Sequence, residues 1–208
     1  MKKRLNQFNI VIVGTGGQGL ITLLQILAKA ALNEGCDVKT AELHGLSQRG
    51  GSIEVHIRFG ENIFSPLVKQ EGADLIISLE AQESLKACNF ASKTAKTTFL
   101  VNNFFIPIPN QKSLKSEEIE KILKKFSEKV ILIPASDICQ KKLGTDVTAG
   151  IYLIGLTAFQ KLIPLKPDSI KFGIKKIIPE KYLEMNLKTF NLAKKAMKTT
   201  FSYSPSLG

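Results

Sequence analysis

The sequence predicts an α/β protein with a three-layer α/β/α, Rossmann-like sheet. We expect the sheet to be mostly parallel, with an antiparallel hairpin at one edge, and the C-terminal part to be helical. A β-branched run at 9–13 ends in glycines and is followed by an apolar stretch with helical spacing, Leu20–Asn33. A strand-like run at 38–42 completes a β-loop-α-β unit, from which doubly wound folds are built. Finally, apolar and polar residues alternate strictly at 52–58, which is typical of a half-buried strand.

Each element is predicted from its local pattern. The run at 9–13 suits a buried parallel strand, and the helix after it should end before Gly35, because glycine favours the conformation that closes a helix. Along 52–58 the polar face carries His56, and we expect 59–63 to turn into a returning edge strand. Further strands are expected at 73–79, 97–101 and 130–133, and helices from about residue 81, at 117–126, at 147–162, from Pro167 onwards and at 179–200.

Length and composition favour one domain. The chain has 208 residues, of which 44% are hydrophobic and 23% are charged, as in ordinary globular proteins. We expect a single domain over 1–200, long enough to bury a full core, and a frayed tail at 201–208. The net charge is +11, and lysines supply nearly all of it. We interpret the lysines as a solvated surface; a basic face can also steer an acidic redox partner.

Hydropathy and cysteine use indicate a cytoplasmic protein. The apolar stretches are too short for a secretory signal, or for a membrane span of about 20 apolar residues. The cysteines Cys36, Cys88 and Cys139 lie far apart and form no C-x-x-C pair. We therefore expect reduced thiols in the cytoplasm, and no metal or iron–sulfur cluster held by this chain alone.

The loop after the first strand is rich in glycine. Its sequence, Gly14-Thr15-Gly16-Gly17-Gln18-Gly19, contains G-x-G-x-x-G between a strand and a helix, where backbone N–H groups can bind an anion. Glu42 ends the next strand, where a nicotinamide enzyme holds the ribose hydroxyls. One hypothesis is therefore a stand-alone NAD(P)-binding reductase. The other is that the glycines serve strand–helix packing only. No dehydrogenase active site follows later in the sequence, which argues against the reductase.

The next loop is the most informative stretch. Residues 42–58 hold both histidines and two of the three arginines. Arginine offers a rigid fork for a carboxylate or phosphate that lysine does not reproduce. Arg49 is either a contact to an anionic ligand or partner, or an ion-pair partner of Glu42 or Glu54. We interpret His44 as a loop histidine and His56 as part of a polar ladder. The candidate ligand or partner residues are Gly14, Gly16, Gly17, Gln18, Gly19, Glu42, His44, Ser47, Gln48, Arg49, Gly50 and Gly51.

These two loops resemble a known family. The strings are Gly14-x-Gly-Gly-Gln-Gly, Ala41-Glu-x-His-Gly-Leu-Ser-Gln-Arg-Gly-Gly-Ser52 and His56-Ile-Arg58. Together they are similar to the gamma-type domain of 2-oxoacid:ferredoxin oxidoreductases. Within that family, the form His-Gly-Leu-Ser-Gln-Arg-Gly-Gly resembles the beta subunits of the indolepyruvate branch.

The resemblance varies along the chain. It is strong over about 10–85 and weaker at 150–159 and 186–196. Where the family pattern has an asparagine at the start of the late helix, this chain has Thr148-Ala149. This difference leaves the contacts of that helix open but not the assignment to the family. The middle of the chain, at about 90–147, has no motif that matches the family.

The resemblance implies a subunit with no complete active site of its own. In this family a 2-oxoacid undergoes oxidative decarboxylation to an acyl-CoA, and electrons pass through iron–sulfur clusters to ferredoxin. A large alpha subunit would carry thiamine diphosphate, Mg and the clusters, so this chain is expected to bind no cofactor alone and to be inactive alone. The loops 14–19 and 43–51 would lie together at one end of the sheet and face that subunit. An aryl pyruvate such as indolepyruvate is the substrate that the resemblance favours, and a homodimer of the chain is an open alternative.

Two features suggest other functions. The triplet at 72–74, followed by Asn102-Asn103, imitates a thiamine-diphosphate motif, but it lacks the order Gly-Asp-Gly, and Asp74 suits the start of a buried strand. The lysine content suggests a nucleic-acid-binding protein. Dispersed lysines with few aromatic residues argue against that alternative, so we expect no nucleic-acid partner.

Overall fold

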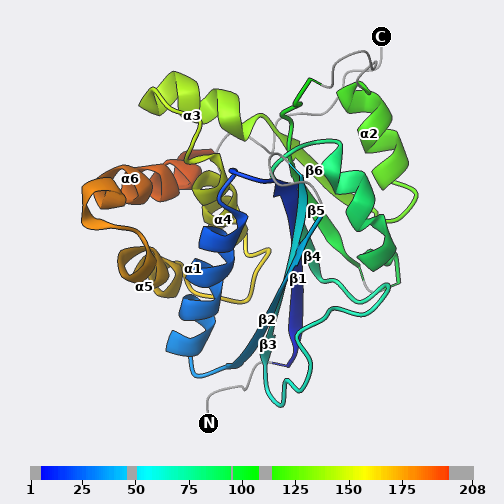
Figure 1. The fold of residues 1–208 in the computed structure, drawn as a ribbon, viewed down its shortest axis with the longest axis horizontal. Coiled ribbons are helices and arrows are strands. Elements are labelled where there is room, and N and C mark those ends of the chain that lie inside the picture. Colours follow the sequence, from blue (N-terminus) through cyan, green and yellow to red (C-terminus); the bar gives the residue numbers. More distant parts are fainter. Residues whose placement is uncertain (1–5, 46–50, 95, 108–113, 197–208) are drawn as a thin grey trace.

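The structure is a computed structural model that describes residues 6–45, 51–94, 96–107 and 114–196. One six-stranded sheet forms its centre, and helices cover both faces (Figure 1). The predicted α/β class is therefore confirmed. The strands are β1 (Phe8–Thr15), β2 (Asp37–His44), β3 (Ser52–Gly60), β4 (Leu75–Ser78), β5 (Thr98–Asn102) and β6 (Lys129–Ile133). The helices are α1 (Leu20–Asn33), the 3-10 helix η1 (Glu83–Phe90), α2 (Ser116–Leu123), α3 (Ala135–Leu143), α4 (Ala149–Phe159), α5 (Pro167–Ile177) and α6 (Glu180–Ala196).

The strand order is β2-β3-β1-β4-β5-β6. β1, β4, β5 and β6 pair in parallel, whereas β3 pairs antiparallel with both β1 and β2. The predicted antiparallel edge hairpin is confirmed, and it consists of β2 and β3. The return expected at 59–63 is wrong, because β3 is itself the returning strand. It ends at Gly60, whose φ of 139° and close contact with the backbone of Asn6 leave no room for a side chain.

The parallel strands are apolar because both of their faces are buried. In β1, Ile10 and Ile12 join the core beneath α1, and Val11 and Val13 join the core beneath η1. Successive side chains of a strand point to opposite faces, so a strand covered on both sides needs apolar residues throughout.

The two faces of the sheet are covered unequally. α1 and α4 pack on one face, with α5 against α1 and α6 against α4, whereas η1 and α2 cover the other face (Figure 1). Gly173 allows the close crossing of α1 and α5, because a side chain there would clash with the carbonyl oxygen of Ile26. The result is one thick, layered helical side and one thin side.

The helix expected from about residue 81 is present as a 3-10 helix that begins at Glu83. Pro179 precedes α6 instead of lying in its first turn, and α3 was not predicted. The signals for α3 are Asp137 in its first turn and Lys141 in its last, each matched to the helix dipole. The expected end of the last helix at 197–200 and the tail at 201–208 lie outside the described residues. In the part of the chain that the structure describes, none of the helices is long and apolar enough to cross a membrane.

Candidate site at the carboxyl end of the sheet

The two glycine-rich loops meet at the carboxyl ends of the parallel strands. The N–H of Gly16 donates to the carbonyl oxygen of Gly51 at 2.9 Å, and Thr15 pairs with Ser52 in the sheet. The described ends of both loops are therefore in contact, at the end where open α/β sheets bind ligands. The middle of the second loop, with Ser47, Gln48, Arg49 and Gly50, lies outside the described residues.

The side chain of Gln18 fills the first loop from inside. Its Oε1 accepts the N–H of Thr15 at 2.8 Å, and its Nε2 donates to the carbonyl of Leu79 at 3.3 Å. A Cβ on Gly14 would lie 2.6 Å from the same Oε1, so residue 14 must be glycine for this arrangement to form. Gly17 and Gly19 have φ of 96° and 80°, which glycine adopts readily. The loop is thus closed on its own side chain, and one N–H that an anion would use is already bonded.

Glu42 does not stand where a dinucleotide fold places its acidic residue. It pairs with Val55, level with Ile12, and the whole of β3 separates it from β1. In dinucleotide-binding folds the strand with the acidic residue lies next to the first strand. Here Glu42 lies near His44, with carboxylate and imidazole 3.6 Å apart and both exposed. The stand-alone NAD(P)-binding reductase is therefore not favoured.

His56 is buried in the sheet and has a structural role. Its Nε2 lies 2.7 Å from Oε1 of Glu54, and its Nδ1 accepts the N–H of Val68 at 2.9 Å. The acceptor role of Nδ1 places the ring proton on Nε2, facing the carboxylate. The edge of the ring also packs against Phe90, with centroids 5.0 Å apart. The polar ladder expected on this face of β3 is present between Glu54 and His56. His56 is buried, whereas Glu54 and Arg58 are half-buried.

A buried polar network lies beneath the loops, and its carboxylates were not among the predicted site residues. Glu80, only 2% exposed, accepts the N–H of Glu83 at 2.7 Å and that of Ile106 at 3.3 Å. The Glu83 carboxylate accepts the hydroxyl of Ser52 and the Nζ of Lys86, the latter at 2.7 Å. Burial raises the pKa of Glu80, and the N–H donors offset part of that shift. The network ties β3 to η1 and to the segment after β5.

Asp74 and Asn102 lie at opposite ends of neighbouring strands, which rules out a shared thiamine-binding motif. Asp74 precedes β4 and accepts the N–H of Asn9 at 2.7 Å. Asn102 ends β5 and donates to the carbonyl of Leu79 at 3.0 Å and to Oγ of Ser136 at 2.9 Å. In the sequence, Asn102 could have been noticed as a polar residue at the end of a buried strand. The side chain of Asn102 joins β5 to the end of β4 and to α3.

Thr148, where the resemblance predicted an asparagine, precedes α4 as its N-cap residue and is buried. Oγ1 of Thr189 donates to Oγ1 of Thr148 at 3.0 Å, so this threonine joins α4 to α6. Cys139 of α3 also forms a side-chain hydrogen bond with Thr148. Burial nevertheless raises the pKa of the Cys139 thiol to about 11, so the thiol stays protonated at neutral pH. Thr148 thus provides a side-chain connection between α4, α6 and α3.

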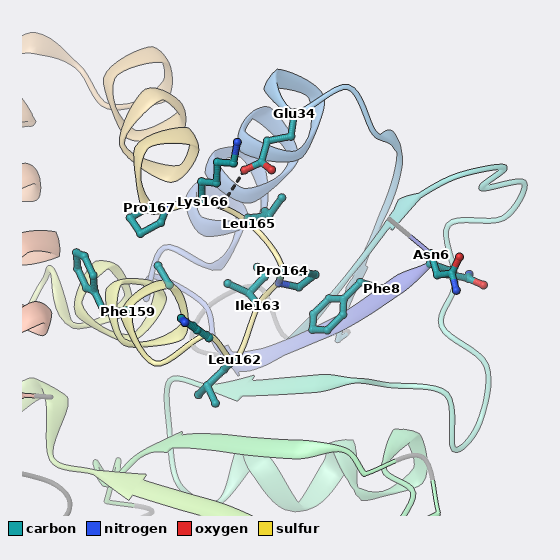
Figure 2. A pocket seen from close by; sticks show the side chains of 13 residues that line it. Asn6, Phe8, Glu34, Phe159, Leu162, Ile163, Pro164, Leu165, Lys166 and Pro167 are labelled. Atoms are coloured by element: carbon teal, nitrogen blue, oxygen red, sulfur yellow. Dashed lines mark hydrogen bonds between the residues drawn. The ribbon is translucent and has the colours of Figure 1, made fainter. Parts of the chain in front are cut away.

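A hollow of about 700 Å³ lies at the opposite end of the sheet (Figure 2). Phe8 at the start of β1, Phe159 at the end of α4 and the connection at 162–167 line it. Glu34 accepts the backbone N–H of Lys166 at 2.7 Å on one side. Of the predicted site residues that the structure describes, none lines this hollow. Across the described ranges, no three His, Cys, Asp or Glu side chains gather in a way that would hold a metal ion.

The sequence is similar to two curated archaeal subunits. Residues 9–196 match the family described as pyruvate ferredoxin/flavodoxin oxidoreductase. The indolepyruvate oxidoreductase subunit IorB of Thermococcus kodakarensis is 35% identical over 202 residues, which cover 93% of this chain and 98% of that one. The subunit of the same name from Archaeoglobus fulgidus is 33% identical over 189 residues, which cover 89% and 93%.

The fold is also that of solved members of this family. The pyruvate oxidoreductase subunit PORC of Thermotoga maritima matches 92% of this chain and 97% of its own with a TM-score of 0.61. The 2-oxoglutarate:ferredoxin oxidoreductase of Magnetococcus marinus matches 98% of this chain, but only 33% of its own, with a TM-score of 0.69. Each of the two is 18% identical to this chain in sequence, so these matches support the fold alone. The sequence matches go further: the chain belongs to the pyruvate ferredoxin/flavodoxin oxidoreductase family, as one of its gamma-type chains.

Proposed function

We propose that this chain is the subunit of an indolepyruvate-type 2-oxoacid:ferredoxin oxidoreductase that carries neither thiamine diphosphate nor iron–sulfur clusters. The observation that carries the proposal is the identity of 33% and 35% to IorB subunits over about nine-tenths of the chain. A large alpha subunit would bind thiamine diphosphate, Mg and the clusters. The complex would decarboxylate an aryl pyruvate oxidatively to an acyl-CoA and pass the electrons to ferredoxin.

The geometry of the carboxyl end supports a partner-facing role. Gln18 closes the first loop, and Ser52, Glu83 and Glu80 bind the base of the second loop to η1. A surface fixed in this way loses little conformational entropy when a partner covers it. The loops 14–19 and 43–51 would face the alpha subunit near its active site or the path of CoA, and Arg49 is the residue that we assign to an anionic contact.

The thiols support a reducing compartment. Cys36, Cys88 and Cys139 are all free, and burial raises the pKa of Cys88 and of Cys139 to about 11. Free cysteines of this kind are typical of proteins that work in the cytoplasm, where we place this subunit.

Purification of the tagged chain from its source cells, without oxygen, tests the proposal. We expect a larger subunit to co-purify, with bound thiamine diphosphate and iron–sulfur absorption. Turnover with CoA should be faster with indolepyruvate than with phenylpyruvate or pyruvate. A chain that purifies alone and binds NADH or NADPH at micromolar concentration would contradict the proposal. Sedimentation of the isolated chain would show whether it forms a homodimer.

Substitution of Arg49 tests the proposed anionic contact within the complex. We expect Arg49→Ala to lower turnover or to raise the KM for an anionic reactant, and Arg49→Lys to restore only part of the loss because lysine lacks the fork. Arg58→Lys is a suitable control, since Arg58 donates to Asn9 and Ser65 within the chain. If Arg49→Ala left both assembly and turnover unchanged, Arg49 would have no such role.

A further inference from the structure

The net positive charge, rather than the lysines themselves, is concentrated on one side of the molecule. Residues 161–196 hold nine lysines and three acidic residues, a net charge of +6 within the +11 of the whole chain. On the opposite face of the sheet, residues 115–129 hold five lysines and four glutamates, a net charge of only +1. More than half of the excess positive charge therefore belongs to α5, α6 and the connection before them.

These lysines point away from the core. In α6 the buried side chains are Asn186, Thr189, Phe190 and Ala193. A helix repeats every 3.6 residues, so lysines spaced seven apart form a stripe on the side opposite these buried residues. In α5, Lys175 likewise lies opposite the buried residues Ile170 and Gly173. We call the exposed side chains Lys181, Lys188 and Lys195 of α6 the lysine face.

The charge of the lysine face is not neutralised within the chain. Lys171 of α5 lies 3.6 Å from Asp168, which accounts for one of the three acidic residues of this region. Within the part of the chain that the structure describes, no carboxylate forms an ion pair with any lysine of the face. A cluster of exposed like charges of this kind produces a field that attracts oppositely charged macromolecules.

We propose that the lysine face docks the acidic protein electron acceptor of the assembled oxidoreductase, a carrier of the ferredoxin or flavodoxin type. The inference rests on the proposed function. Such carriers are small acidic proteins, and transient redox complexes depend on charge complementarity over small, polar contacts. Residues 161–196 contain no arginine, so the face offers mobile point charges rather than the rigid forks that grip phosphates.

The position of the face agrees with this role. α5 and α6 lie outside α1 and α4, on the side of those helices away from the sheet (Figure 1). The loops at 14–19 and 43–51 lie instead at the carboxyl end of the strands. α6 also packs against α3, which follows the carboxyl end of β6. A carrier on the lysine face would therefore border a large subunit that covers the loops, and the clusters that reduce the carrier would lie on that subunit.

Charge reversal in the assembled complex tests the proposal. The variant is Lys181→Glu, Lys188→Glu and Lys195→Glu in one chain, and the measurements are the KM for ferredoxin and the kcat at low and high ionic strength. We expect the KM to rise about tenfold at low ionic strength and less at high ionic strength, because salt screens the attraction. The kcat, and the rate with methyl viologen as a small cationic acceptor, should stay unchanged.

The matched control is Lys93→Glu, Lys121→Glu and Lys125→Glu, which changes the net charge equally on the thin side of the molecule. An equal rise in KM for this control, or no rise for the first variant, would overturn the proposal. The proposal would also be overturned if the first variant lost binding to duplex DNA and kept its KM for ferredoxin. The lysine face would then be a nucleic-acid-binding surface. If even the unaltered complex fails to reduce methyl viologen with a 2-oxoacid, the proposed function itself fails.

Discussion

The two ends of the parallel sheet are built on different principles. At the carboxyl end, side chains from two loops, η1 and β5 bond to one another and to backbone groups beneath the glycine-rich turns. At the amino end, mostly apolar side chains surround a hollow of about 700 Å³. The hollow at the amino end is lined by none of the described candidate residues. The described polar groups at the carboxyl end form hydrogen bonds within the chain. For this chain, the polar end is therefore better suited to present a fixed surface than to enclose a small molecule.

Loss of the Glu80 side chain should have the largest effect on stability. Glu80→Ala leaves the N–H groups of Glu83 and Ile106 without their acceptor, and each unsatisfied buried group costs ~1–3 kcal/mol. We expect the free energy of unfolding in urea to fall by roughly 3 kcal/mol. Leu162→Ala at the half-buried lining of the hollow should cost only about 1 kcal/mol. A larger loss for Leu162→Ala would reverse the comparison of the two ends.

The pH dependence of stability should also carry the signature of Glu80. Its pKa in the folded chain is raised above the ordinary value of 4.5, so the unfolded chain loses the proton at lower pH than the folded chain does. The free energy of unfolding therefore falls as pH rises from the unfolded pKa to the folded pKa. Glu80→Gln cannot titrate and should show a shallower fall between pH 4 and 7 in urea melts. Parallel curves for the two proteins would contradict this.

Asp74→Asn gives the corresponding test at the amino end of the sheet, because burial also raises the pKa of Asp74.

The packing of Gln18 against Gly14 should give an intermediate effect. Gln18→Ala removes hydrogen bonds to Thr15 and Leu79, at a cost of roughly 1–2 kcal/mol. Gly14→Ala adds a Cβ against Gln18 and should cost ~1–3 kcal/mol. Because the two changes share one contact, the double variant should lose less stability than the two single losses together. Additive losses in urea unfolding would show that Gln18 does not set the requirement for glycine.

The smallest expected effect is a gain in stability at the hollow. α4 ends at Phe159 and is capped by Gln160. Lys161 follows with a φ of 56°, and the N–H of Leu162 donates to the carbonyl of Thr157 at 2.8 Å. This helix end favours glycine, so Lys161→Gly should raise the free energy of unfolding by ~0.5–1 kcal/mol. Gly35 follows the end of α1 in the same position, with a φ of 82°, so Gly35→Ala is the opposite control and should destabilise. A loss of stability in Lys161→Gly would show that the lysine side chain contributes more than its backbone conformation costs.

Elements with strong periodicity were predictable, and their neighbours in space were not. The helix predicted at Leu20–Asn33 has those bounds, because its apolar spacing and Gly35 are local signals. The place of β3 between β1 and β2 depends on pairing across the sheet, which no local pattern encodes. In the sequence, Glu42 follows the glycine-rich loop at the spacing of a ribose-binding acidic residue. In the fold, β3 lies between its strand and β1.

The candidate site was predictable only in part, for a similar reason. The glycine-rich loops are recognisable because their residue types are unusual. Glu80 and Glu83 follow a buried strand as two of many acidic residues, and only the fold brings the second to Ser52. Gln18 belonged to the predicted loop, but its inward direction follows from the space above Gly14, which the sequence does not reveal.

The position of β3 also has a consequence for how the chain reaches its fold. β2 and β3 are joined by residues 45–51 alone, so their pairing closes a short loop. The pairing of β1 with β3 must enclose α1 and β2, and closing that longer loop costs more entropy. We therefore expect the hairpin to form as a local unit that docks on β1 afterwards. The loop between β2 and β3, which has the most distinctive sequence of the chain, would then belong to a segment that folds early. Its contact with the loop after β1 would form later, when the hairpin pairs with β1.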